Sequence, residues 1–129
     1  MKALYSLLLF IFIQPALSDD AITNFTDSLD GTAITYTYSG GRSYNLKFDG
    51  GEISYRYLTG TKPDKWWGPF PYKAMVTDQG EFLVAWYEQG YGDYITLLIN
   101  LEAEILYGSG IINKNSTHFE KALISNIER

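Results

Sequence analysis

One carboxylate ends a row of large apolar side chains in the middle of this chain. Residues 80–101 have the alternation of two strands joined by a Gly-rich turn, and strand side chains alternate between two faces. Glu88 therefore ends a face that also carries Val84 and Trp86. Burying a carboxylate on an apolar face is costly unless a neighbour pairs with it or a proton neutralises it. Such a group has a raised pKa, so Glu88 is the first candidate for binding or proton transfer.

Tyrosines form the second candidate group. Period-two alternation in residues 33–38, 42–48 and 52–59 puts a row of large side chains on one face of each segment. The aromatic residues expected to face inward are Tyr36, Tyr38, Tyr44, Tyr55, Tyr57 and Trp86. Any one of them is explained as a core aromatic whose polar atom finds a partner. Together with Glu88 and Lys65 they predict a site for a small aromatic or acidic ligand.

Short strands must position these groups. The sequence predicts strands at 33–38, 42–48, 52–59, 72–77, 81–89, 94–101 and 102–113. Gly108 and Gly110 favour a bend or bulge in the last of these. Residues 116–127 fit a strand, through Phe119, Ala122 and Ile124, or a helix, and we expect a strand. Seven or eight short strands at this spacing predict an all-β fold, a small antiparallel calycin-like (lipocalin-like) β-barrel with room for one small ligand.

Lys65 and Trp66 fall in a segment, residues 60–71, that breaks the alternation. Its three prolines and two glycines argue against a regular interior strand. Yet the segment also holds Trp67 and Phe70, and adjacent tryptophans favour burial. We expect a lid or plug over one end of the barrel. A loop packed on a sheet edge explains the pattern equally well.

The first residues have the pattern of a secretory signal peptide. Lys2 precedes an apolar run that is short for a bilayer span, and small residues stand at Ala16 and Ser18. Cleavage after residue 18 predicts an exported, periplasmic or extracellular, single domain of residues 19–129; the alternative is an uncleaved N-terminal anchor. That domain carries nine basic and fifteen acidic side chains, a formal net charge of −6. We therefore expect neither nucleic acid nor a membrane as its partner.

The chain contains no cysteine and one histidine, His118. The absence of cysteine excludes disulfides, thiolate chemistry and zinc–thiolate sites. A single histidine excludes a multi-histidine metal site. We expect His118 to be an exposed strand or loop residue, and we expect no metal or organic cofactor. The 11 tyrosines, 7 phenylalanines and 3 tryptophans favour strands and the lining of a pocket.

The spacing of the candidate residues resembles that of the phenolic acid decarboxylases. It is also similar, more loosely, to the small MoaF-like domains that share their calycin-type barrel. The Tyr-x-Tyr motif of the decarboxylases corresponds to Tyr36 and Tyr38, and a third tyrosine six residues later corresponds to Tyr44. The family's Tyr-Arg pair on the third strand corresponds to Tyr55-Arg56.

The resemblance continues into the loop and the fifth strand. The family's loop Arg-Trp corresponds to Lys65-Trp66, and its catalytic glutamate, just after a strand tryptophan, corresponds to Glu88. The match runs without a gap as far as Glu88 and extends less clearly through Ile112. It implies that tyrosines and the arginine hold a 4-hydroxycinnamic acid while the glutamate handles proton transfer during non-oxidative decarboxylation, without a metal or organic cofactor.

The chain departs from that family at two points. A lysine at position 65 cannot offer the bidentate fork of arginine. The chain is also shorter than the decarboxylases. We therefore rank binding of a small aromatic or carboxylate-bearing molecule by an exported MoaF-like barrel first. The expected binding residues are Tyr36, Tyr38, Tyr44, Tyr55, Lys65, Trp66, Trp86 and Glu88.

Two other classes of function remain open. The runner-up is a cofactor-independent carboxy-lyase acting on 4-hydroxycinnamic acids, with Glu88, Tyr36, Tyr38 and Lys65 as its catalytic residues. The third class is an interaction protein whose Trp66-Trp67 segment meets a partner. The sequence leaves the choice between a monomer and a homodimer open.

Overall fold

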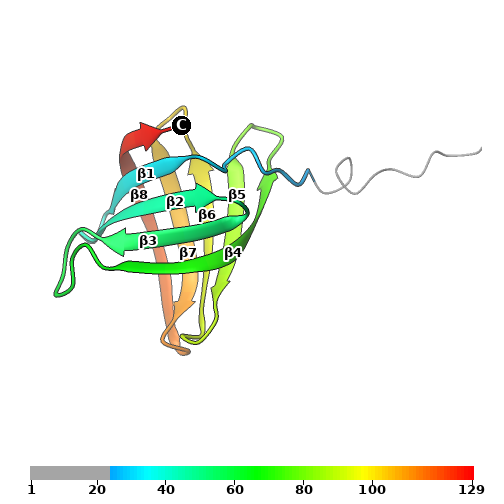
Figure 1. Ribbon diagram of the computed structural model, residues 1–129. Helices are drawn as coiled ribbons and strands as arrows, with labels where there is room; N and C mark the ends of the chain where they lie inside the picture. The colour runs from blue at the N-terminus through cyan, green and yellow to red at the C-terminus, as the bar shows by residue number, and fades with distance from the viewer. Residues whose placement is uncertain (1–23) are drawn as a thin grey trace, which may run out of the picture.

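Alternating side chains give each strand one buried and one more exposed face, as an antiparallel sheet with one covered face requires. In β1 (Ala33–Tyr38), Ile34, Tyr36 and Tyr38 are buried while the residues between them are more exposed. Eight such strands form a closed barrel within residues 24–129, the part of the chain that this computed structural model describes (Figure 1). The predicted all-β antiparallel barrel is confirmed.

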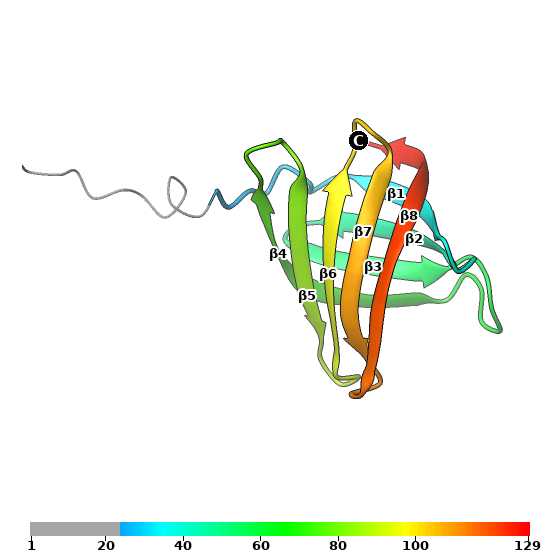
Figure 2. The same ribbon diagram turned by 180° about the vertical axis from the view of Figure 1, so that it is seen from behind.

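The strands follow one another around the barrel in chain order. After β1 come β2 (Ser43–Asp49), β3 (Glu52–Tyr57), β4 (Trp66–Val76), β5 (Phe82–Glu88), β6 (Asp93–Asn100), β7 (Ile105–Ile112) and β8 (Ser116–Glu128). Antiparallel pairing of β8 with β1 closes the wall. Seen from behind, β5–β8 run steeply across one half of the barrel and β1–β3 cross the other half, while β4 bends from beside β3 to run beside β5 (Figure 2). Residues 116–127, which fit either a strand or a helix in the sequence, lie within β8 and form a strand, as expected.

The first half of β4, residues 66–71, corrects the sequence prediction of a loop. The register between β3 and β4 shifts between Ile53 and Tyr55, so that Gly68 and Pro69 lie opposite a single residue of β3. This arrangement is a β-bulge, and a bulge tolerates a proline because the ladder needs no donor from that residue. The proline-rich pattern thus marks a bulged strand, and the loop before it is shorter than expected.

The two glycines of β7 have a different role from the expected one. The strand keeps an unbroken register with both neighbours, so the expected bulge is absent. A Cβ atom at Gly108 would lie 2.5 Å from the hydroxyl oxygen of Tyr38. One at Gly110 would lie 2.6 Å from the carbonyl oxygen of Tyr94 and 2.9 Å from the side chain of Ile95. Glycine at both positions leaves room on the inner face for these two larger side chains.

One end of the barrel is closed by the chain that precedes β1. Residues 27–32 cross the end that holds the turns after β2, β4 and β6, and Leu29 is fully buried there. The amide of Gly31 donates to the carbonyl of Phe48 at 2.8 Å, and the amide of Gly51 donates to the Asp30 carboxylate. These bonds hold the leucine as a plug against the aliphatic half of the interior.

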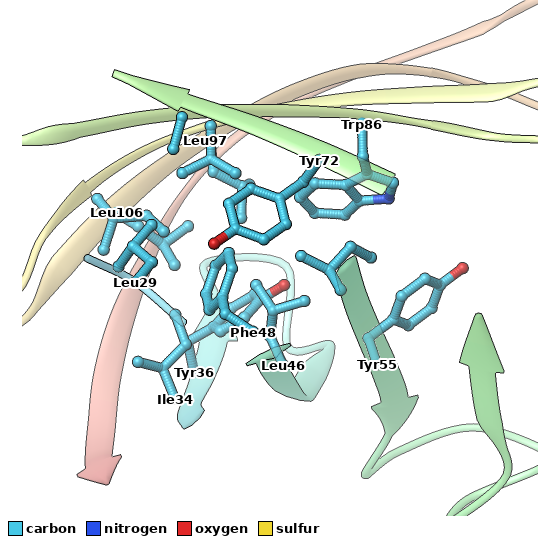
Figure 3. Close-up of a cluster of buried hydrophobic side chains, with 14 of the residues drawn as sticks. Leu29, Ile34, Tyr36, Leu46, Phe48, Tyr55, Tyr72, Trp86, Leu97 and Leu106 are labelled. Carbon is cyan, nitrogen blue, oxygen red and sulfur yellow. The ribbon is translucent and has the colours of Figure 1, made fainter. Parts of the chain in front are cut away.

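The other end holds the turns after β1, β3, β5 and β7, and we call it the mouth. The close-up of the interior shows the difference between the two halves (Figure 3). Leu29, Leu97 and Leu106 gather on one side, while the indole of Trp86 and the ring of Tyr55 lie on the other. The candidate polar residues therefore lie in the mouth half of the barrel.

The expected signal peptide, residues 1–18, lies outside the described residues, and export stays a prediction. Within residues 24–129 no helix is long and apolar enough to cross a membrane.

Candidate functional site

Glu88 lies at the last position of β5, on the inner face, with only 3% of its surface exposed. The hydroxyl of Tyr55 donates to its Oε2 atom at 3.0 Å, and the indole N–H of Trp86 donates to its Oε1 atom at 3.1 Å. The tryptophan reaches it because residues two apart on a strand share a face. Each carboxylate oxygen therefore has a fixed donor.

Burial is the main influence on the acidity of this group. Loss of solvent raises the pKa of the Glu88 carboxyl, and the nearby charge of Asp93, its cross-strand partner, raises it further. The hydrogen bonds from Trp86 and Tyr55 favour the charged form and oppose this pKa shift. Glu88 thus has the environment of a carboxyl that can hold a proton and deliver it to a bound molecule.

Tyrosine rings surround the carboxyl from β1, β2 and β3. Tyr36 and Tyr38 meet edge to face with ring centroids 5.3 Å apart, and Tyr44 stacks on Tyr36 at 5.5 Å. Tyr44 also contacts Tyr57 at 4.8 Å, and Tyr55 contacts Tyr57 at 5.9 Å. These offset and edge-on arrangements are the favourable ones for aromatic pairs. The cluster forms a continuous aromatic wall.

The hydroxyls of this wall are donors rather than anions. Burial raises the pKa of Tyr36, Tyr38 and Tyr55 well above the usual range. Burial and the neighbouring Tyr57 raise the pKa of Tyr44 to about 12, although the positive charge of Arg42 opposes the shift. At neutral pH each phenol is protonated and can donate a hydrogen bond to an oxygen of a bound molecule.

A cavity of about 60 Å³ lies between these groups and opens toward the mouth. Six of the expected binding residues line it: Tyr36, Tyr38, Tyr44, Tyr55, Trp86 and Glu88. Their convergence follows from the alternation, because each is on the inner face of its strand near the mouth. The sequence therefore predicted the placement of this part of the site.

Lys65 and Trp66 lie elsewhere, and neither lines this cavity. The ammonium of Lys65 lies over the ring of Trp67, 4.0 Å from its centroid. Trp66 is 37% exposed, and its ring lies between the cationic groups of Lys47 and Arg56 on the outer face of β4. The side chain of Trp66 therefore points away from the cavity that it was expected to cover. Instead, Trp67 faces inward.

Three charged or titratable residues line the cavity without having been expected there. They are Arg42 in the β1–β2 turn, Asp93 at the start of β6 and His118 in β8. The histidine is half-buried rather than exposed, with its ring 4.6 Å from that of Tyr38. Burial lowers its pKa, and the Glu120 carboxylate 3.6 Å away opposes that shift.

The alternation of β8 contained the signal for the histidine. His118 is an even number of residues from Ala122 and Ile124, both buried, so it shares their inner face. Phe119 belongs to the opposite face and is 88% exposed. Arg42 had a signal of the same kind, since it opens the expected strand 42–48 two residues before Tyr44, although in the structure it lies in the turn before β2. Among residues 24–129, no cluster of three or more side chains is arranged to hold a metal ion.

Comparison with known proteins supports the barrel and goes no further. No family model and no curated protein matches the chain. Among solved structures it resembles a crystal structure from Burkholderia vietnamiensis that is described as "a putative beta-lactamase", with a TM-score of 0.66. The two chains are 14% identical, and the match covers 74% of this chain and 92% of the other. At this identity the likeness concerns the fold, and the barrel is consistent with a calycin-like one.

Proposed function

We propose that the barrel binds a small aromatic or carboxylate-bearing molecule in the tyrosine-lined cavity at its mouth. The observation that carries the proposal is the buried carboxyl of Glu88, fixed by Tyr55 and Trp86 inside a wall of protonated phenols. A core without a ligand gains nothing from burying this group, because an aliphatic side chain there would avoid the desolvation cost. Convergent polar groups in an aromatic pocket are the usual features of a small-molecule site.

The size of the cavity limits how a ligand enters. About 60 Å³ holds a few water molecules, since one water needs about 10–15 Å³, whereas a dry cavity that takes benzene is about 150 Å³. An aromatic ring therefore requires side chains at the mouth to move apart. Tyr44 and Tyr57 are suited to this movement because both are only half-buried and their rings pack against each other at the opening.

A decarboxylase-like activity is the second candidate, and the burial of Glu88, which raises the pKa of its carboxyl, favours it. A carboxyl with a raised pKa beside several phenol donors can transfer a proton to a substrate while the phenols stabilise its oxygen atoms. The resemblance in motif spacing would make 4-hydroxycinnamic acids the substrates of such an activity. The position of Lys65 weighs against this candidate, because the cation expected to hold the substrate contacts Trp67 instead.

A thermal-shift and calorimetric screen tests the binding proposal. The probes are 4-hydroxycinnamic acid, benzoic acid, 4-hydroxyphenylacetic acid and, as an aliphatic control, hexanoic acid. We expect saturable binding of aromatic acids and an increase in melting temperature that grows with ligand concentration. Binding of none of the aromatic probes would contradict the proposal.

Carbon dioxide release from 4-hydroxycinnamic acid separates the two functions. If Glu88 transfers a proton, Glu88→Gln should lower turnover by about 10²-fold or more. If the protein only binds, wild type should release nothing, and Glu88→Gln should change affinity by about 1 kcal/mol, the value of one hydrogen bond. Release by wild type that disappears in the variant would reverse the ranking of the two functions.

A further inference from the structure

A second hollow adjoins the tyrosine cavity at the mouth. It has a volume of about 410 Å³, is open to solvent, and lies between the β3–β4 loop and the β1–β2 turn. Its lining includes the cations of Arg42 and Lys62, the hydroxyls of Thr59 and Thr61, and the indole of Trp67, and contains no acidic side chain. We call this hollow the annex. Its lining is rich in hydrogen-bond donors and positive charge.

The positive charge of the annex is not neutralised by the acidic residue of the same loop. Asp64 lies 3.5 Å from the guanidinium of Arg56 on β3. Within residues 24–129, no carboxylate comes within 4.0 Å of the side-chain nitrogens of Arg42 or Lys62. A guanidinium with no carboxylate partner keeps its bidentate face available for one.

Trp67, which lines the annex, carries a donor that lacks a partner within residues 24–129. Its indole nitrogen is buried and has no hydrogen-bond partner in the described part of the chain. A buried N–H without an acceptor is costly, and such groups are usually satisfied by protein, water or a ligand. Thr59 adds a donor, since its Oγ1 atom accepts from the amide of Ser43 at 3.2 Å and its own proton is still available.

The annex and the tyrosine cavity are parts of one depression with opposite charge preferences. Arg42 and Tyr57 line both hollows. The inner cavity contains the carboxylate of Asp93, which would repel a further anion, and both oxygens of Glu88 already accept hydrogen bonds from Tyr55 and Trp86. An aromatic acid therefore has one favourable orientation, with its ring among the tyrosines and its carboxylate outside them.

We propose that the annex is an anion subsite in which Arg42 and Lys62 hold the carboxylate of an aromatic acid whose ring enters the tyrosine cavity. This inference rests on the proposed binding function and makes it more specific, because it identifies the ligand as both aromatic and acidic. Arg42 contacts the carboxylate directly and is the residue that selects acids over neutral analogues. Lys65 plays no part in this selection.

The test compares 4-hydroxycinnamic acid with its neutral amide, 4-hydroxycinnamamide, on wild type, Arg42→Gln and Lys62→Gln. Both substitutions are in exposed positions outside the strands, so the barrel should fold unchanged. The matched control is Lys47→Gln, which removes an exposed cation that lies over Trp66 on the outer face. Isothermal titration calorimetry gives the affinities. Because the amide is uncharged, a change in its affinity reports a change in the shape of the site rather than the loss of a charge.

We expect Arg42→Gln to weaken binding of the acid by about tenfold or more and Lys62→Gln by a few-fold, in line with charged hydrogen bonds. Affinity for the amide should stay within about twofold in all variants, and Lys47→Gln should match wild type with both probes. In a ¹H–¹⁵N spectrum, the indole resonance of Trp67 should shift with the acid and not with the amide.

Two results would overturn the inference in distinguishable ways. If wild type binds neither the acid nor the amide, the proposed function fails and the anion subsite fails with it. If wild type binds the acid but Arg42→Gln binds it equally well, or weakens acid and amide alike, the function stands and the subsite is wrong. An unchanged Trp67 indole resonance on binding of the acid would also contradict it.

Discussion

The two halves of the barrel interior use the same strands for different purposes. At the closed end, side chains such as Phe48, Ile53, Leu97 and Ile99 are at most 1% exposed and are entirely apolar. At the mouth, β2 and β3 continue with the tyrosines Tyr44, Tyr55 and Tyr57, and β5 ends in Glu88. One half removes apolar surface from water, whereas the other keeps polar atoms where a bound molecule can reach them.

If the barrel binds a ligand as proposed, the difference between the two halves separates stability from binding. The aliphatic half has few polar groups to satisfy, so its contribution to folding depends on burial and packing alone. The tyrosine half carries hydroxyls, a carboxyl and an indole N–H that need partners, and Trp67 lacks one. A substitution at the closed end should therefore change stability, and one at the mouth should change binding.

The largest expected effect is on stability and comes from the closed end. Phe48→Ala removes a ring that is 1% exposed and packs edge-on against Tyr72, 5.1 Å away. We expect a loss of about 3–5 kcal/mol in the free energy of unfolding, typical for a buried phenylalanine. The contrasting variant is Tyr44→Phe at the mouth, which should cost no more than about 1 kcal/mol in urea denaturation and should weaken ligand binding. Similar losses of stability in both variants would remove the proposed separation.

The sequence predicted the barrel and its inner face well because both depend on local alternation. Tyr36, Tyr44, Tyr55 and Glu88 were placed by period two alone, and closure of eight strands brings them together. The same reasoning failed at β4, where a bulge lets Pro69 occupy a strand. A bulge shifts the alternation by one residue, and nothing local in the sequence specifies which partner strand absorbs the shift.

A smaller effect is expected from the pH dependence of stability, and it tests the charge state at the mouth. The pKa of the Glu88 carboxyl is raised above 4.5 in the folded protein, mainly by burial. At pH values between the pKa of Glu88 in the unfolded chain and its higher pKa in the folded protein, the folded state binds more protons than the unfolded state. Stability therefore falls as the pH rises through this window. Each unit by which the folded-state pKa of Glu88 exceeds its unfolded-state pKa changes the free energy of unfolding by about 1.4 kcal/mol across this window.

Glu88→Gln should lose this part of the pH dependence. Relative to wild type, the variant should become more stable as pH rises through the same window, as measured by urea denaturation at several pH values from 4 to 8. Glu52→Gln, which removes an exposed carboxylate from β3, serves as the control. A variant with the same pH profile as wild type would mean that Glu88 titrates normally and that burial does not alter its charge.

The cavity residues that sequence reasoning missed lie in a turn or near the starts of β6 and β8: Arg42, Asp93 and His118. Arg42 shares the parity of Tyr44 in the expected strand 42–48, but it lies in the turn before β2, where alternation no longer fixes the direction of a side chain. His118 has a periodic signal only if residues 116–127 form a strand, and the sequence of that segment also fits a helix. Lys65 was assigned from a resemblance in spacing, and spacing gives no direction for a side chain in a loop.

The smallest expected effect is at Lys65, and it decides between the placement observed here and the role implied by the resemblance. Its ammonium lies over the ring of Trp67 in an exposed position, an interaction worth about 0.5–1 kcal/mol. Lys65→Ala should therefore reduce stability by no more than this amount, and affinity for 4-hydroxycinnamic acid should change by less than about twofold.

Lys65→Arg sharpens this last test, because it restores the bidentate fork that the resemblance requires. Arginine stacks on an aromatic ring at least as well as lysine, so stability should be retained. Since residue 65 lines neither the cavity nor the annex, we expect no gain in affinity for 4-hydroxycinnamic acid and no gain in carbon dioxide release. A clear gain in either would show that the β3–β4 loop can turn residue 65 toward the tyrosines. In that case the mouth would have a second arrangement, and the ligand's carboxylate would have a partner other than Arg42.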